Sequence, residues 1–476
     1  MLDSEQLENI GFRWVLSKVE LMTPYGQELC SRPRFYTSDC AEELREEQRN
    51  VACLKELVGS DMPKINALLR LLMPIKDVRR SIESLTERTL SEVELFEIKR
   101  FLLELELIAP AVSALGTELR GMDVRALPGA LDVIDPDGTR SPSFYVSDRL
   151  SERLAAIRRE RKDTDAAIKR EGLTDELSAR RTRLAAEEED ENARVRGIIC
   201  EGLRPYKKAL LDNAASIGRL DLALGKARLA YEYGAVKPTA GAERFAMRNM
   251  KNPRYSAVLE EKGRSFVPVS LELERGSVVI TGANMGGKSV AIKTLALNAM
   301  LAMCGFFVFA EEAGLPFLDD ICLLSEDRED AESGLSSFGG EMKAFDGIIQ
   351  GTAKKDCVLV LLDEFARGTN PHEGAKLVCA AARLFNERSN TYAVIATHFD
   401  GIAKLARLHY QVAGLRNTGL EKLHAEFRTG GEASLSRLMD YGLYPVSREE
   451  EPPRDAVKII RALGVTEEFT RLLDIE

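Results

Sequence analysis

The spacing of apolar residues changes along the chain. In the first half they recur every three or four positions, which is typical of one face of a helix. Later, short and largely apolar runs appear at residues 277–280, 358–362 and 392–396. Such runs indicate strands that are buried on both faces of a parallel sheet. The helical positions are Leu44, Val51, Leu54, Val58, Leu95, Ile98, Leu102 and Leu105. The pattern predicts an all-α region followed by an α/β domain.

A different helical pattern occupies residues 148–196. This segment carries acids and bases in near-equal number and no proline, and its apolar residues form only a sparse stripe. A thin stripe suits a projecting antiparallel helical hairpin, with Gly172 at its bend. An ordinary solvated surface helix has the same periodicity, so the spacing leaves both interpretations open. The stripe consists of Leu150, Leu154, Ile157, Ile168, Leu177 and Leu184.

One apolar stretch, residues 291–310, approaches the length of a membrane span. Lys293 and Asn298 interrupt it, and it directly follows the glycine-rich residues 282–287. A spanning helix needs a longer uninterrupted apolar run. We therefore expect a helix that is buried against a sheet.

Composition narrows the class of protein. The chain has 476 residues, of which 45% are hydrophobic and 30% charged, which is typical of a globular protein with about two to four domains. Its eight cysteines show no CxxC pair and no zinc-type spacing, which indicates reduced thiols. Asp3, Glu5 and Glu8 interrupt any apolar run at the N-terminus. We therefore expect no secretory signal and a cytoplasmic location.

The clearest candidate chemistry lies in residues 281–289, which read Thr-Gly-Ala-Asn-Met-Gly-Gly-Lys-Ser between a predicted strand and a predicted helix. A glycine-rich turn lets successive backbone N–H groups point at phosphates, and the helix N-terminus adds a favourable field. Lys288 can reach the β and γ oxygens, and the Ser289 hydroxyl can bind Mg²⁺. The pattern predicts ATP and Mg²⁺ as cofactors. The predicted nucleotide-binding residues are Gly282, Asn284, Gly286, Gly287, Lys288 and Ser289.

Two later strands are predicted to deliver polar residues to the same sheet edge. Residues 358–362 end in Asp363 and Glu364, the pattern of a Walker B segment. Asp363 then holds Mg²⁺ through water, and Glu364 orients the attacking water. Residues 392–396 lead to Thr397 and His398, and His398 is a candidate sensor of the γ-phosphate. A lone histidine can also be a satisfied polar residue at a strand end. The predicted catalytic residues are Glu364, His398 and Lys288.

Together these motifs resemble the ATPase domain of the MutS family, which belongs to the ABC-type ATPases. The resemblance rests on residues 281–289, 336–342, 361–370, 373–374 and 396–399. It implies a head-to-tail homodimer in which Ser336 or Ser337 of one subunit reaches the γ-phosphate held by the other. The loop 367–370 then crosses the dimer seam. Taken alone, residues 336–341 also fit a loop that enters a helix, with a serine cap and Glu341 a few residues on.

The resemblance extends more weakly to the rest of the chain. Residues 23–29 are similar to the opening of the MutS core, and residues 134–139 to the turn that enters its lever helices. Asn252 departs from the family pattern at the entry to the ATPase, and we assign it no role. The expected fold is an α/β P-loop ATPase of ABC type, preceded by an all-α core with a projecting helical lever hairpin. The expected domains are a helical core (1–145), lever or clamp helices (146–200), a return of the core (201–250), the ATPase (251–430) and a C-terminal helical dimerisation element (431–476).

The sequence is less direct about what the ATPase acts on. The Phe-x-Glu motif of mismatch-reading MutS proteins occurs only at residues 309–311 and 385–387, inside the ATPase, so direct mismatch reading is disfavoured. A net charge of −10 supplies no general attraction to DNA. The basic runs 158–162 and 180–183 can still contact phosphates, although neighbouring acids favour a solvated surface. We also expect no nuclease module after the ATPase.

Three functions therefore stay open. The chain resembles short MutS-like ATPases associated with adenosylcobalamin-dependent aminomutases such as lysine 5,6-aminomutase, both in length and in residues 363–371. That resemblance implies a protein client, whose reactivation we favour. The alternative is a clamp that binds mismatched or branched DNA by shape. A third possibility is an ATP-binding scaffold with little turnover, which the presence of Glu364 disfavours.

Overall fold

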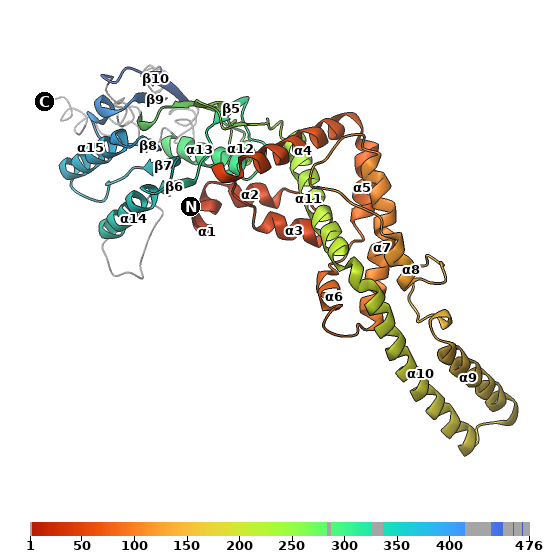
Figure 1. Cartoon of the computed structure of the whole chain (residues 1–476). Coiled ribbons are helices and arrows are strands. Elements are labelled where there is room, and N and C mark those ends of the chain that lie inside the picture. Colours follow the sequence, from red (N-terminus) through yellow and green to blue (C-terminus); the bar gives the residue numbers. More distant parts are fainter. Residues whose placement is uncertain are drawn as a thin grey trace. The chain divides into compact units, whose positions relative to one another are not determined.

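The computed structural model describes residues 2–282, 287–325, 337–414 and 439–450, together with positions 460 and 469. Contacts divide the chain into two compact units. The sheet unit comprises Met1–Val19, Arg34–Arg49 and Arg228–Glu476, and the helical unit comprises Glu20–Pro33 and Asn50–Ala227. Figure 1 shows both units and labels many of their elements.

The helical unit is built from helices and turns throughout its described residues. Its helix α7 begins with a capping box, in which the Ser91 side chain and the Glu94 side chain each bond the other's backbone N–H. The α-helices are α3 (Pro24–Ser31), α4 (Ala41–Ser60), α5 (Met62–Leu72), α6 (Arg79–Ser84), α7 (Glu92–Ser113), α8 (Pro128–Ile134), α9 (Glu152–Glu171), α10 (Asp175–Leu203) and α11 (Lys207–Glu232), of which α4 and α11 continue into the sheet unit.

A buried carboxylate ties the start of α3 to α11. Asp221 is fully buried and accepts hydrogen bonds from the backbone N–H groups of Met22 and Thr23 and from the Thr23 hydroxyl. Thr23 in turn caps α3 by accepting from the backbone N–H of Gly26. A buried charge is tolerated when it receives several hydrogen bonds in this way.

Helices α9 and α10 pack along each other. Helix α9 ends at Gly172, whose φ of 86° favours glycine, and α10 begins after the capping residue Thr174. The buried part of the seam contains Leu154, Ile157 and Leu184. Three residues of the sparse apolar stripe are therefore buried, and Ile168 and Leu177 are half-buried.

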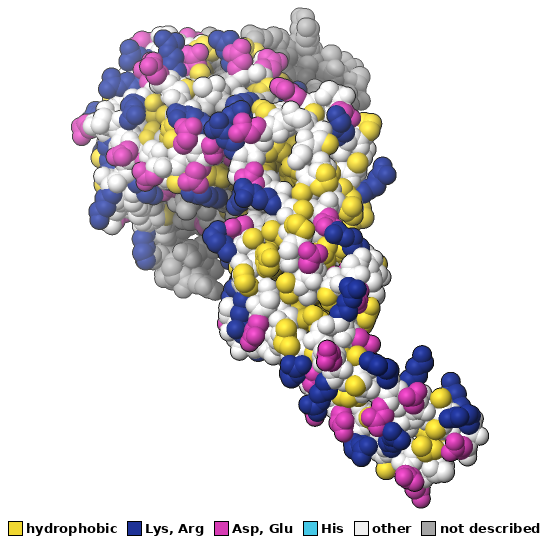
Figure 2. All heavy atoms as spheres, turned by 45° about the vertical axis from the view of Figure 1, so that its right-hand side comes forward, with side chains coloured by type: hydrophobic (Ala, Val, Ile, Leu, Met, Phe, Trp, Pro, Cys, Tyr) yellow, Lys and Arg dark blue, Asp and Glu magenta, His cyan; other side chains and the backbone are white. Residues whose placement is uncertain are grey.

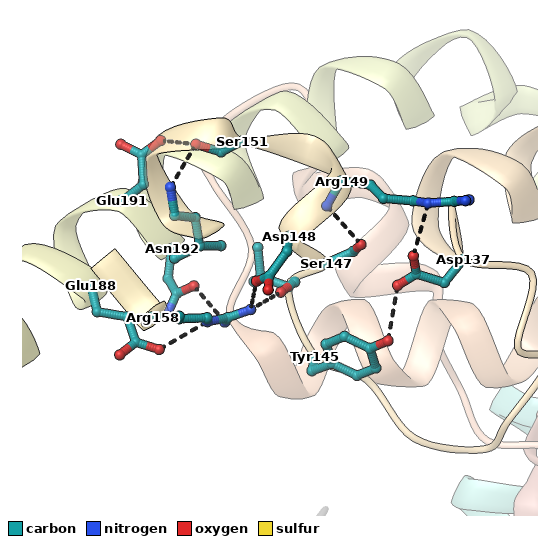
Figure 3. Close-up of polar contacts among 12 residues, drawn as sticks. Asp137, Tyr145, Ser147, Asp148, Arg149, Ser151, Arg158, Glu188, Glu191 and Asn192 are labelled. Atoms are coloured by element: carbon teal, nitrogen blue, oxygen red, sulfur yellow. Dashed lines mark hydrogen bonds and ion pairs between the residues drawn. The ribbon is translucent and has the colours of Figure 1, made fainter. Parts of the chain in front are cut away.

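Polar contacts join the base of this helix pair to the chain that enters it (Figure 3). The Arg158 guanidinium donates to the Val146 carbonyl at 2.7 Å and to the Asp148 carboxylate at 2.6 Å. On α10 it also donates to Glu188 at 3.0 Å and to Asn192 at 3.2 Å. One side chain of α9 thus holds the entering segment and α10 together.

The main sheet of the sheet unit has the strand order β10-β9-β4-β8-β7-β6. All neighbouring pairs are parallel except β10 with β9. Strands β4, β7 and β8 are buried along their whole length, as their apolar sequences predict. Their bounds are β4 (Gly276–Thr281), β6 (Asp320–Leu324), β7 (Val358–Asp363), β8 (Thr391–Ala396), β9 (Leu408–Gly414) and β10 (Asp440–Val446).

A smaller sheet has the order β1-β5-β2-β3. Two helices from the start of the chain also belong to this unit, where Phe12 packs edge-on against Phe306 and the Gln6 amide donates to the Leu323 carbonyl at 2.7 Å. These elements are β1 (Thr239–Ala240), β2 (Phe245–Met250), β3 (Val269–Leu273), β5 (Glu312–Leu315), α1 (Ser4–Asn9), α2 (Phe12–Ser17) and α12 (Pro253–Glu261).

Short 3-10 helices occur in both units, at Ser38–Cys40, Asp148–Leu150, Arg204–Tyr206 and Ile402–Leu405.

Three further helices follow strands of the main sheet. They are α13 (Lys288–Met303), α14 (Ser337–Thr352) and α15 (Pro371–Glu387). Helix α13 covers most of the long apolar stretch of the sequence and packs against β6, β7 and β8, as expected for a buried helix. Within the described ranges, no helix combines the length and the apolar character that a membrane crossing requires.

Two expectations about domain limits differ from the structure. Residues 440–446, assigned from the sequence to a helical dimerisation element, form strand β10 and extend the main sheet past residue 430. Pairing with β9 decides their conformation, and β9 lies too far away in the sequence for local periodicity to reveal it. The first residues of the chain also group with the sheet unit and not with the helical core.

Candidate active site

The predicted phosphate loop lies at the carboxyl end of β4. Strand β4 ends at Thr281, and α13 begins at Lys288 after Gly287, whose φ is 91°. A Cβ atom on Gly282 would lie 3.1 Å from the Val412 Cβ, and the φ of Gly282 is 142°, so the position requires glycine. Asn284 and Gly286 lie outside the described residues.

Lys288 is buried at the first turn of α13. Its Nζ donates to the Gly282 carbonyl at 2.9 Å and lies 3.5 Å from Oε1 of Glu364. Burial lowers the pKa of the Lys288 ammonium, whereas the Glu364 carboxylate acts in the opposite direction. The geometry thus directs a cation at the phosphate loop and holds it beside an acid.

Ser289 and Asp363 meet at the same edge. The Ser289 hydroxyl donates to Oδ1 of Asp363 at 3.0 Å. Burial raises the pKa of the Asp363 carboxyl, and the hydrogen bond from Ser289 partly offsets this. Mg²⁺ prefers oxygen ligands and uses one or two carboxylates together with water and substrate phosphates. A hydroxyl and a carboxylate oxygen at this separation therefore fit a magnesium ion.

Glu364 follows β7 directly and has an unusual backbone. Its φ is 55°, and that of Ala366 is 62°. Non-glycine residues in this left-handed region are strained and cluster at functional sites. The Glu364 backbone N–H donates to the Ala396 carbonyl at 3.0 Å, and Arg367 Nη1 donates to the carboxylate at 2.8 Å. These contacts turn the buried carboxylate back toward Lys288.

His398 follows β8 and is half-buried. Register aligns Ala396 of β8 with both Asp363 and Ile280, so His398 lies at the edge that carries the phosphate loop. The Nδ1 atom of His398 is buried and makes no hydrogen bond within the described part of the chain. A buried polar atom without a partner is costly, unless a ligand supplies the bond. The sensor role of His398 stays a prediction.

Helix α14 and the loop after β7 contact each other near the site. Glu341 accepts from the Ala366 backbone N–H at 3.0 Å, which the sequence did not suggest. Ser336, expected to act on the partner's nucleotide, lies outside the described residues. Ser337 is the first residue of α14, but its side chain is not among those that the structure describes. The predicted action across a dimer seam therefore stays a prediction.

Sequence reasoning missed two residues that touch this region. Tyr441 of β10 lies beside the phosphate loop, because a Cβ atom on Gly287 would be 3.4 Å from its ring. His409 of β9 contacts Thr281, the last residue of β4. Neither belongs to a local motif. Only the pairing of β9 with β4 and β10 brings them to the loop.

The chain resembles known proteins in its amino-acid sequence. Residues 278–431 match the family model of MutS domain V, which is a P-loop ATPase domain. The chain is similar to the DNA mismatch repair protein MutS of Pseudothermotoga lettingae, with 31% identity over 243 residues, or 50% of this chain and 29% of that protein. The protein of the same name from Thermus aquaticus is 35% identical over 216 residues, or 44% of this chain and 26% of that protein.

A third relative, the DNA mismatch repair protein MutS of Methanothrix thermoacetophila, is 31% identical over 279 residues. That alignment covers 58% of this chain and 30% of the relative. The chain therefore spans less than a third of the length of each of these three relatives. The family model covers residues 278–431, and the activity and partners of the whole protein are proposed below.

Proposed function

We propose that this protein hydrolyses ATP in the manner of the MutS ATPase domain. The observation that carries the proposal is the convergence of two pairs from distant parts of the sequence: Ser289 with Asp363 at 3.0 Å, and Lys288 with Glu364 at 3.5 Å. A phosphate-binding lysine, a magnesium pair and an acid for water are the groups that phosphoryl transfer to water requires.

Each residue has a distinct role in this proposal. Lys288 and the backbone around Gly287 bind the β and γ phosphates, and His398 contacts the γ-phosphate through its unpartnered face. Ser289 and Asp363 hold Mg²⁺, which neutralises phosphate charge when it is bound. Glu364 orients the attacking water, and the hydrogen bond from Arg367 holds that carboxylate in place. The Tyr441 ring beside Gly287 offers a flat apolar surface on which a nucleotide base can stack.

We further propose that the active enzyme is a homodimer whose ATPase domains face each other head to tail. In such a dimer Ser336 or Ser337 completes the partner's site, and ATP binding closes the pair. The helices α9 and α10 then act as levers that transmit the closure. This arrangement follows from the resemblance to MutS proteins, and the hydrogen bonds by which Arg158 joins the entering segment to α10 support it.

For the client we favour a protein, and specifically the reactivation of an adenosylcobalamin-dependent aminomutase. In support, the arginines of the α9–α10 pair are largely neutralised by carboxylates of the same helices. Arg180 pairs with Glu160, and Arg181 with Asp165. On the face seen in Figure 2, positive and negative side chains alternate along this part of the molecule. A DNA-binding surface is normally a continuous basic patch.

The alternative client is mismatched or branched DNA. The observation that favours it is the name of the three relatives, which assigns them to DNA mismatch repair. Shape recognition can work with few base contacts, although it still needs phosphate contacts. Lys162 and Arg159, in the first basic run, are the residues to examine for such contacts.

ATP hydrolysis is tested with two variants. Lys288→Ala should reduce ATP affinity by at least about tenfold, because it removes the cation that faces the phosphates. Glu364→Gln should leave affinity within about twofold and lower kcat by about a hundredfold or more. Binding is measured by calorimetry and turnover by phosphate release. Full turnover by Glu364→Gln, or full affinity in Lys288→Ala, would contradict the proposal.

The client is tested with the Glu364→Gln variant held with Mg²⁺ and ATP. Purified lysine 5,6-aminomutase and branched or mismatched DNA duplexes are offered separately, the DNA at low salt. We expect retention of the aminomutase and recovery of its activity by the wild-type protein. Retention of DNA with no effect on the aminomutase would replace the protein client by the DNA client.

A further inference from the structure

A buried histidine on β9 bonds to the residue at which the phosphate loop begins. His409 is 2% exposed, and its Nε2 atom lies 2.8 Å from Oγ1 of Thr281. Its Nδ1 atom lies 2.8 Å from the carbonyl oxygen of Ser447, which follows β10. The imidazole therefore links β4 and β9 to the residue that follows β10, and in the register it lies level with Val279, two positions before Thr281.

The partners determine the protonation of this ring. A carbonyl oxygen only accepts, so the hydrogen of the imidazole lies on Nδ1 and is donated to Ser447. Nε2 then carries a lone pair and accepts from the Thr281 hydroxyl. The Gln411 amide donates to the same hydroxyl oxygen at 3.4 Å. Burial lowers the pKa of His409, which agrees with a neutral ring.

The orientation of Thr281 bears directly on the phosphate loop. Thr281 precedes Gly282, whose carbonyl accepts from Lys288 Nζ at 2.9 Å. On its other side Gly282 lies tightly against Val412 of β9. The entrance of the loop is thus held by β9 through a polar contact at His409 and a steric contact at Val412.

We propose that His409 is a positioning residue for nucleotide binding, because its neutral imidazole fixes the Thr281 hydroxyl and with it the entrance of the phosphate loop. The proposal rests on the ATP-binding function proposed above and adds a residue outside the phosphate-loop and strand-end motifs. The competing explanation is that His409 only fills space between β4 and β10. Under that explanation its replacement lowers stability without a selective effect on nucleotide affinity.

Two amide variants separate the two hydrogen bonds of the ring. The Gln side chain in His409→Gln places a carbonyl oxygen near the position of Nε2, so it can still accept from Thr281. The shorter side chain in His409→Asn places its amide near Nδ1, so it can still donate to Ser447 but does not reach Thr281. Both variants lose one bond and have similar polarity, which makes each the matched control of the other.

The experiment measures the Kd for ATP with Mg²⁺ and the melting temperature of both variants. We expect His409→Asn to bind ATP about fivefold more weakly than His409→Gln, because that factor corresponds to the free energy of one buried neutral hydrogen bond. The affinity of His409→Gln should stay within about twofold of the wild type. We also expect the KM for ATP to be higher in His409→Asn while kcat stays nearly unchanged, because His409 touches no reacting atom.

A double-mutant cycle with Thr281→Val identifies the route of the effect. Thr281→Val removes the hydroxyl at nearly constant volume, so it should reproduce the loss seen in His409→Asn. Combining the two should add little further loss, because both remove the same bond. Losses that multiply in the double variant would show independent actions and overturn the proposal.

The outcomes also separate this inference from the function on which it rests. If the wild type binds ATP and both amide variants bind with equal affinity, the positioning role is overturned and the ATPase proposal stands. If the wild type itself binds no ATP, both fall together. If melting temperature and affinity decline in parallel for both variants, the space-filling explanation replaces the positioning role.

Discussion

Ionisable side chains in the site reduce the free-energy cost of one another's burial. Lys288 and Glu364 are both buried and ionisable, and each lies within reach of the other. Removing one charge leaves the other unpaired in a region of low polarity, which is costly. His409 avoids the cost of a buried charge in another way, because its ring stays neutral and each ring nitrogen forms a hydrogen bond.

His409 makes stability depend on pH in a defined window. Its pKa in the folded protein is lowered by burial, and Glu450 is the charged group that opposes this shift. The unfolded chain therefore takes up a proton below about pH 6.5 that the folded protein refuses. The contribution of the neutral ring is fully present above that pH and is lost as the pH falls.

The comparison of wild type with His409→Gln isolates this contribution. We expect the wild-type free energy of unfolding to fall more steeply than that of the variant between about pH 7 and pH 5.5, by at most about 1.4 kcal/mol per pH unit. Urea titrations followed by the fluorescence of Trp14, the single tryptophan, report on the sheet unit. Parallel pH profiles would show that His409 does not titrate in this way.

At the scale of elements, the α9–α10 pair has a largely polar base. The Ser151 hydroxyl donates to Glu191 at 2.6 Å inside the seam, and Arg194 holds the same carboxylate. The hydrogen bond and ion pair from Arg194, followed by the bond from Ser151, lower the pKa of Glu191 to about 2. Directional polar bonds thus add to the burial of Leu154, Ile157 and Leu184 in holding these helices together.

Arg158 is the residue whose loss should loosen this element most. Arg158→Lys keeps the charge but cannot donate simultaneously to the entering segment and to α10. We expect a loss of about 2 kcal/mol in local stability, consistent with several charge-assisted bonds. Hydrogen exchange should accelerate in residues 144–151 and at the start of α9. The control is Arg181→Lys at an exposed pair, which should change exchange little.

At the scale of the molecule, each unit is assembled from separate stretches of chain. The sheet unit combines the first helices with the ATPase strands, and the helical unit lies between them in the sequence. The chain therefore crosses between the units several times, at α4 and α11 among other places.

The proposed dimer predicts complementation between two inactive variants. Lys288→Ala is expected to bind ATP too weakly for turnover at an ATP concentration near the wild-type Kd. A Ser336→Ala/Ser337→Ala double variant lacks the residues proposed to act in trans. In a mixed dimer one of the two sites has all its parts. We expect an equal mixture to recover roughly a quarter of wild-type turnover, since half of the dimers are mixed and each has one working site. Simple inactivity of the mixture would indicate that each subunit acts alone.

The sequence predicted the local structure well where a motif consists of consecutive residues. Residues 277–281, 358–364 and 391–398 specify a strand followed by polar residues, and parallel pairing then brings Lys288, Ser289, Asp363 and Glu364 to one edge. Asn284, Gly286 and Ser336 were singled out by the same motifs and lie outside the described residues. The catalytic roles of these residues are proposals that the variants above test.

What the amino-acid sequence determined by itself is the chemistry of the site, because a phosphate loop, a strand ending in two acids and a strand ending in Thr-His are each encoded within a few residues. Only the tertiary structure decided which residues surround the site and how the neighbouring elements pair. Thr281 and His409 are 128 positions apart, β10 became a strand only by pairing with β9, and Gln6 reaches Leu323 across 317 positions. Contacts of this range depend on how strands and helices pack, and local periodicity carries no information about that packing.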